Sequence, residues 1–159
     1  MESIVVTNRT RTLSGRRVVW LRGGLSLLTF IDGALGVWVL VSPEGFFSLP
    51  WVNLGMDYNP HLMLDYGAMN LAAAVVLGAG AVTMRAGLVR AALVSYLLWS
   101  FAHFLIHLHF AAHTAVAGLP ILLVLLGLGV AIPLALLVVA FPRRQAEAVN
   151  GAPGSASAG

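Results

Sequence analysis

Residues 119–141 read LPILLVLLGLGVAIPLALLVVAF, a run of 23 residues without a single ionisable side chain. At a rise of about 1.5 Å per residue, a helix of this length is roughly 34 Å long. That length is enough to cross the ~30 Å hydrocarbon core of a bilayer with slight tilt. The segment therefore predicts a transmembrane helix, and Pro133 near its middle predicts a kink.

Three further apolar segments precede it, at about residues 18–42, 61–84 and 88–110. Of the 159 residues in the chain, 59% are hydrophobic and only 9% are charged, which excludes a water-soluble globular domain. Soluble domains typically have about 25% charged residues, because their surface has to be covered with polar side chains. We predict an all-α integral membrane protein, folded as an antiparallel four-helix transmembrane bundle that contacts the lipid bilayer.

The basic residues are distributed asymmetrically about the four spans. All nine are arginines, and they lie before or at the start of the first span, in the segment 85–90 that joins the second and third spans, or after the fourth. The loops at 42–60 and 109–118 contain none. Because basic flanks stay on the cytoplasmic side, we predict a multi-pass protein of the cell membrane with both termini in the cytoplasm. Topology accounts for the net charge of +3, and we expect no nucleic-acid partner.

The remaining segments are interpreted from composition. Residues 1–17 are polar and basic and predict a cytoplasmic arm, whereas residues 142–159 are rich in Ala, Gly and Ser and predict a disordered cytoplasmic tail. Residues 18–141 form the membrane domain, in which the aromatic stretch 46–52 is expected at the bilayer interface and residues 85–90 as a tight turn. The chain has no cysteine, which excludes disulfides, thiolate metal sites and cysteine nucleophiles.

Five ionisable residues in the spans are candidate functional groups, because charges inside a bilayer are costly. They are Asp32 in the first span, His61 and Asp65 in the second, and His103 and His107 in the third. A spacing of four residues places both members of each pair on one helix face. Counted along their helices, both pairs lie in the outer half of the bilayer, and Asp32 lies deeper. We predict that the five face the bundle interior and converge, with Asp65 within reach of His103 or His107.

Three kinds of site fit these residue types. The first is a structural network in which Asp65 pairs with His103 or His61 and holds the bundle together. The second is a zinc, non-haem iron or haem site built from His61, Asp65, His103 and His107, although His103 and His107 share one helix face and cannot clamp one haem from both sides. The third is a proton relay or quinone-type site with Asp32 at its inner end. The residues do not identify a cofactor.

Small residues recur at four-residue spacing along the second span, where they permit close approach of another helix. The pattern leaves open whether that helix belongs to the same chain or to a second subunit. These small residues are Gly67, Ala68, Ala72, Ala74, Gly78 and Ala79.

Several blocks of this sequence resemble a known group of proteins. The blocks are DYNPHL at 57–62, DYGAMNL at 65–71 and FAHFLIH at 101–107. In order and spacing they resemble small actinobacterial four-span membrane proteins that are DoxX-like in layout, and the likeness covers about residues 18–141. Members of that group typically carry Asn-Glu-His where this chain has Asn-Pro-His at 59–61, so one acid is missing here. The resemblance implies a four-span fold and, through DoxX-like relatives, a link to membrane redox chemistry and quinones.

Two function classes follow from these observations. One is a non-catalytic membrane subunit or accessory protein with a structural His/Asp network, partnered by a second copy or by another membrane protein. The other is a metal- or haem-dependent or quinone-linked membrane redox protein that uses the same residues. Metal and haem analysis of the purified protein, together with an absorption spectrum, distinguishes the two.

The predicted topology is testable by cysteine labelling, because the chain has no cysteine of its own. Ser48→Cys and Thr114→Cys should react with a membrane-impermeant thiol reagent in whole cells, since both positions are predicted to be extracytoplasmic. Gly87→Cys should react only after the cells are permeabilised. Labelling of Gly87→Cys in intact cells, without labelling of the other two, would show that the topology is inverted.

Overall fold

The computed structural model describes residues 15–111 and 118–141, and this part of the chain is helical without β-strands. Four of the helices are long and apolar enough to cross a membrane, as the composition predicts. The predictions for the remainder of the basic arm and for the C-terminal tail lie outside the described residues. The helices are α1 (Arg16–Val41), α2 (Pro43–Phe47), α3 (Pro50–Asn53), α4 (Pro60–Thr83), α5 (Ala86–Ala111) and α6 (Leu119–Ala140).

The long helices agree with the predicted spans to within two residues at each end. The prediction of a turn over 85–90 is wrong, because α5 already begins at Ala86 and includes Arg90. Met84 takes a left-handed backbone conformation with φ 49°, which ends α4 and reverses the chain within two residues. Helix α1 begins at Arg16, two residues before the first predicted span, so Arg16 and Arg17 belong to the helix and not to the predicted arm.

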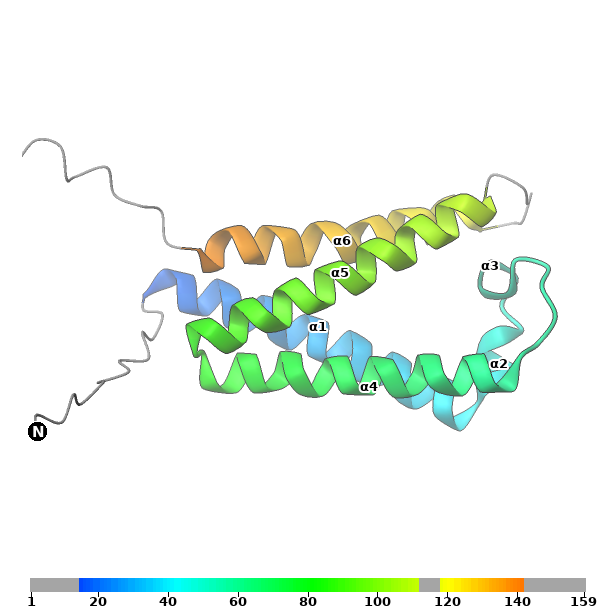
Figure 1. Cartoon of the computed structure of the whole chain (residues 1–159), viewed down its shortest axis with the longest axis horizontal. Helices are drawn as coiled ribbons and strands as arrows, with labels where there is room; N and C mark the ends of the chain where they lie inside the picture. The colour runs from blue at the N-terminus through cyan, green and yellow to red at the C-terminus, as the bar shows by residue number, and fades with distance from the viewer. Residues whose placement is uncertain (1–14, 112–117, 142–159) are drawn as a thin grey trace, which may run out of the picture.

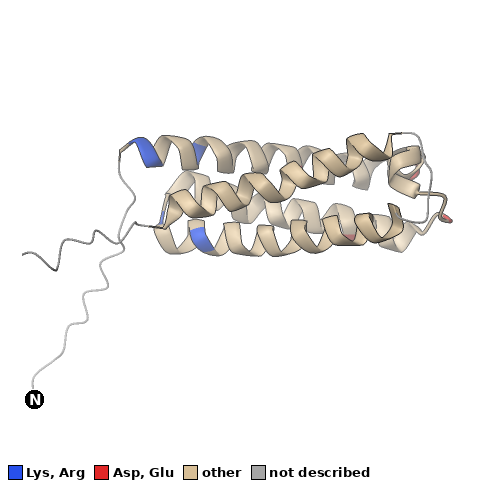
Figure 2. Cartoon of the chain, turned by 90° about the horizontal axis from the view of Figure 1, so that it is seen from above, with Lys and Arg blue, Asp and Glu red and all other residues tan. Residues whose placement is uncertain are grey.

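The two ends of the bundle differ in structure and in charge. Figure 1 shows the four long helices side by side, with α2 and α3 gathered at one end and the α4–α5 turn at the other. We call these the α2/α3 end and the arginine end, because Figure 2 shows the described arginines at the latter and the acidic positions toward the former. This separation agrees with the arginine distribution expected from the sequence. Helix α6 continues through Pro133 from Leu119 to Ala140.

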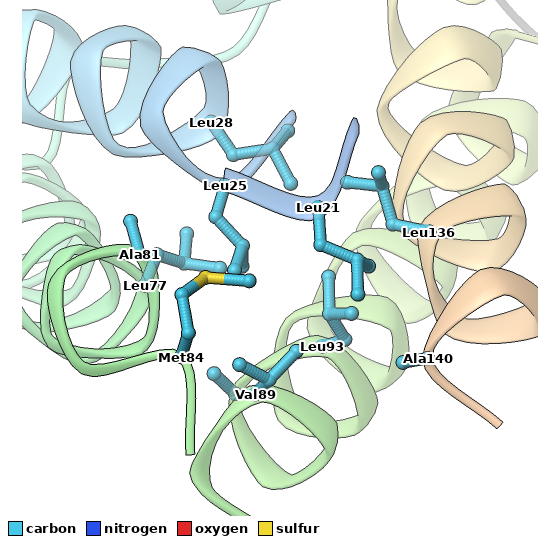
Figure 3. Close-up of a cluster of buried hydrophobic side chains, with 11 residues drawn as sticks. Leu21, Leu25, Leu28, Leu77, Ala81, Met84, Val89, Leu93, Leu136 and Ala140 are labelled. Carbon is cyan, nitrogen blue, oxygen red and sulfur yellow. The ribbon is translucent and has the colours of Figure 1, made fainter. Parts of the chain in front are cut away.

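The arginine end is closed by an apolar core to which α1, α4, α5 and α6 all contribute (Figure 3). Two arginines complete this end by bonding the last turns of neighbouring helices. Arg22 Nε donates to the Ala81 carbonyl and Arg90 Nε to the Ala140 carbonyl, each at 3.1 Å. Such carbonyls have no partner within their own helix. The buried members of the core are Leu21, Leu25, Leu28, Leu77, Ala81, Met84, Val89, Ala92, Leu93, Leu136 and Ala140.

The bundle is built from two helix pairs, because α1 packs most extensively against α4, and α5 against α6. Helices α1 and α4 approach closely at Gly36 and Gly67, where a Cβ added to Gly36 would lie 2.9 Å from the Gly67 carbonyl oxygen. Farther along, Gly78 of α4 faces Thr29 of α1, so the contacts run in opposite order along the two helices. The sequence left open whether the small residues of this span contact a helix of the same chain or of a second subunit. Gly67 and Gly78 contact α1 of the same chain.

Gly36→Ala is expected to lower the free energy of unfolding by about 1–3 kcal/mol, because the added methyl group meets the Gly67 carbonyl oxygen of the α4 backbone as well as the Leu71 side chain, and the backbone cannot move aside without separating the helices. Gly129→Ala in α6 is the matched control, since nothing lies within 4 Å of its added Cβ. That change should be neutral or should stabilise the helix by up to about 1 kcal/mol. Unfolding in bicelles measures both variants, and equal stability of the two would contradict the close approach.

Candidate functional site

His61 and Asp65 lie at the beginning of α4 and point away from the bundle interior. The helix begins here because Asn59 caps it, with its side-chain oxygen accepting a hydrogen bond from the Leu62 N–H at 3.1 Å, and Pro60 occupies the first turn. His61 Nδ1 lies 2.8 Å from Asp65 Oδ2, and the two side chains are 85% and 67% exposed. The prediction that this pair faces the interior is wrong, and the ion pair that Asp65 makes is with His61 of its own helix. At the beginning of the helix, the His61 and Asp65 side chains pair with each other and remain exposed, so neither needs a partner in the interior.

His103 and His107 of α5 belong to a column of rings, here called the aromatic column, together with Trp99 of α5 and Tyr66 of α4. The His103 ring stacks on Trp99 at a centroid distance of 5.0 Å and on Tyr66 at 5.6 Å. His107 meets His103 edge-on at 4.6 Å, and Tyr66 contacts Trp99 at 6.2 Å. The column therefore joins α5 to α4 along the half of the bundle nearer the α2/α3 end.

Helix α2 extends these ring contacts to α1. Phe46 stacks on Tyr66 at 6.1 Å and meets Trp38 of α1 edge-on at 5.4 Å. Phe46 is only 8% exposed, whereas Trp51 of α3 is 40% exposed. The stretch 46–52, expected to be interfacial throughout, thus contributes a buried ring to the bundle at its beginning and a more exposed ring near its end.

Asp32 lies in the interior, as predicted, with only 3% of its surface exposed. The Tyr96 side chain of α5 lies within interaction range of the Asp32 carboxyl group, and the Oδ2 atom of Asp32 has no hydrogen-bond partner among the described residues. The Tyr66 side chain interacts with that of Asn70 and lies within electrostatic range of Asp32. Asn70 is 2% exposed, and its Nδ2 donates to the Tyr66 carbonyl at 2.7 Å. We call these four residues the interior polar cluster.

Three members of this site are uncharged, and a search for ionisable groups did not single them out. Tyr66 and Asn70 are four residues apart on α4, and Tyr96 lies on α5 below Trp99 and His103 at helical spacing. A search for any hydrogen-bonding side chain repeated on one face of an apolar span would have found them. Their interhelical partners, by contrast, depend on how the helices pack.

A groove of about 290 Å³ runs along the seam between α4 and α5, beside the interior polar cluster. Ala72 and Ala73 form part of its α4 wall, and Ser95, Tyr96 and Trp99 form part of its α5 wall. The small alanine side chains leave this space, because α4 packs more extensively on α1 than on α5. Tyr96 therefore borders both the groove and the Asp32 carboxyl group.

The predicted metal set is not brought together within residues 15–111 and 118–141. In this part of the chain no group of three or more His, Asp or Glu side chains could hold a metal ion, since His61 and Asp65 are exposed and His103 and His107 are half-buried in the column. What the site offers is a continuous set of side chains that donate and accept hydrogen bonds and protons. In the comparisons with known proteins, no family model, curated protein or solved structure matches this chain.

Tyr66→Leu is expected to lower the free energy of unfolding by about 1–3 kcal/mol, because it removes the ring contacts with Phe46, Trp99 and His103. Phe30→Leu on α1 is the matched control, because that ring is 73% exposed. The control should change stability by less than about 0.5 kcal/mol. Unfolding in bicelles measures both, and equal effects would show that the aromatic column does not stabilise the bundle.

Proposed function

We propose that this chain is a non-catalytic membrane subunit or accessory protein, folded as an antiparallel four-helix transmembrane bundle with a structural polar network. The observation that carries the proposal is that buried Asp32 and Asn70 lie together with half-buried Tyr66 and Tyr96, so that the set joins three different helices. Each of these side chains interacts with another member of the set. The network differs from the one expected from the sequence, because it includes neither His61 nor Asp65.

The two helix pairs need such contacts to stay together. Between helices in lipid there is no net gain from burying apolar surface, so close packing and interhelical hydrogen bonds have to supply the attraction. Near the arginine end the leucine-rich core closes the seam between the pairs. Toward the α2/α3 end the aromatic column and the interior polar cluster take that role, which accounts for costly polar groups within the spans.

The proposed orientation places the arginine end, and with it both termini, in the cytoplasm of a cell-membrane protein. Large apolar side chains on the outside of the long helices support contact with lipid, among them Phe30 at 73%, Val82 at 79% and Leu98 at 70% exposure. The same surfaces suit a second copy of the chain or another membrane protein as partner. Membership of the actinobacterial, DoxX-like group is part of this proposal and rests on the sequence blocks described above.

The structural role is tested at Asp32. Asp32→Asn keeps shape and hydrogen bonding and should fold with the stability of the parent protein. Asp32→Leu should lower the free energy of unfolding by about 0.5–2 kcal/mol, because it removes the interaction with Tyr96 and leaves the Tyr96 hydroxyl without this partner. Asp65→Asn is the matched control, since that carboxylate is exposed and should contribute little. If Asp32→Leu is as stable as the parent in bicelles, the network has no structural role.

A quinone-linked membrane redox protein is a second candidate, favoured by the groove between α4 and α5. Its walls combine small apolar side chains with the Ser95 and Tyr96 hydroxyls and the Trp99 ring. A quinone ring could stack on Trp99 while a hydroxyl donates to its carbonyl oxygen. Quenching of tryptophan fluorescence by a short-chain quinone, abolished by Ala72→Leu in the groove wall and retained in Ala34→Leu on α1, would favour this function over the first.

A further inference from the structure

We propose that the aromatic column and the interior polar cluster form a proton path that begins at His107, near the α2/α3 end, and ends on Asp32. This inference goes beyond the structural role proposed above, and it does not depend on that role. It rests on the order of the side chains along the bundle, on two buried polar atoms without partners, and on the apolar core beyond Asp32.

Asp32 is the inner end of the path. Its side chain is 97% buried, as its exposure of 3% implies, and its Oδ2 has no hydrogen-bond partner among the described residues. The titratable side chains that interact with this carboxyl group are Tyr96 of α5 and Tyr66 of α4, and neither carries a positive charge. A lone carboxylate at this depth is costly, so binding a proton relieves the cost of burying its charge.

The column supplies the groups between Asp32 and the α2/α3 end. His107 is half-buried one turn before the end of α5, and its Nδ1 is buried without a partner among the described residues. Its ring touches His103, His103 stacks on Tyr66, and Tyr66 interacts with Asn70 and lies within electrostatic range of Asp32. Imidazole and phenol groups both donate and accept protons, so the ring contacts place three groups that can carry a proton next to one another along the bundle.

Beyond Asp32 the path is closed toward the arginine end. The core shown in Figure 3 consists there of apolar side chains, with Leu25, Leu28 and Leu77 at most 2% exposed. None of these side chains can bind a proton. The net step therefore takes one proton from water at the α2/α3 end and adds it to the Asp32 carboxylate, giving a neutral carboxylic acid, and no electron is transferred.

The other charged groups described at the α2/α3 end are separate from the column. The exposed His109 ring meets Phe110 edge-on. Glu44 of α2 and Asp57 before α4 are exposed, and His61 and Asp65 form their own exposed pair. They provide matched controls, because His61→Gln removes an imidazole and Asp65→Asn removes a carboxylate without touching the proposed path. His103→Phe keeps a ring in the aromatic column, but phenylalanine cannot carry a proton. His107→Phe makes the same change one helical turn nearer the α2/α3 end.

The test is infrared difference spectroscopy of the protein in lipid nanodiscs after a rapid drop in pH. A carboxylic-acid C=O band should appear that is absent in Asp32→Asn and retained in Asp65→Asn. In His103→Phe and His107→Phe the band should appear about tenfold or more slowly, whereas His61→Gln should match the parent. Circular dichroism verifies the fold of each variant, and His103→Gln and His107→Gln replace any phenylalanine variant that does not fold.

Three results would overturn the path. They are no pH-dependent band from Asp32, parental rates in both histidine variants, or equal slowing in the His61→Gln control. The structural role is judged separately, from the stability of Asp32→Leu. Suppose that Asp32→Leu is as stable as the parent, and that the carboxylic-acid band of Asp32 appears more slowly in the histidine variants. These two results together would contradict the structural role and leave the proton path in place.

Discussion

The four long helices are apolar enough to cross a membrane and expose large apolar side chains on their outer faces. Between helices in lipid, the gain that drives apolar side chains together in water is absent and cannot hold them together. Contact has to come from surfaces that fit closely and from polar groups that find each other. The Gly36–Gly67 crossing provides the first, because the absence of a Cβ at both positions lets the two helices come close there. The position of the interior polar cluster depends on this crossing, since α1 has to lie close against α4 for Asp32 to come near Tyr66.

The two halves of the bundle solve the packing problem differently. Near the arginine end, leucine and small apolar side chains fill the interior, and two arginine side chains bond the last carbonyls of α4 and α6. Toward the α2/α3 end, rings and hydrogen-bonding side chains share the interior with a smaller apolar cluster of Val39, Met63 and the buried Phe46 ring of α2. Polar groups that lie in this half of the bundle, beside a purely apolar core in the other half, suit both a structural network and a path that ends at the boundary between the two.

The separation of the predicted site into two parts has a simple electrostatic reason. His61 and Asp65 stand at the beginning of α4, where they are exposed and reach each other, so they gain little from entering the interior. Asp32, near the middle of α1, has neither option, and burial beside Tyr96 is what the bundle offers it. Depth within the span, rather than the identity of the ionisable group, decided which residues entered the interior.

The sequence by itself determined the four long apolar helices to within two residues, the gathering of the described arginines at one end, and the burial of Asp32. Each of these follows from hydrophobic length, from charge placement, or from the cost of a carboxylate in lipid, and none requires knowledge of neighbours. Only the tertiary structure decided that Asn70 and Tyr96 join Asp32, that His103 stacks between Tyr66 and Trp99, and that His61 and Asp65 stay outside. Helical spacing shows which residues share a face, but the facing helix and its register depend on packing at contacts such as Gly36–Gly67, which one sequence does not specify.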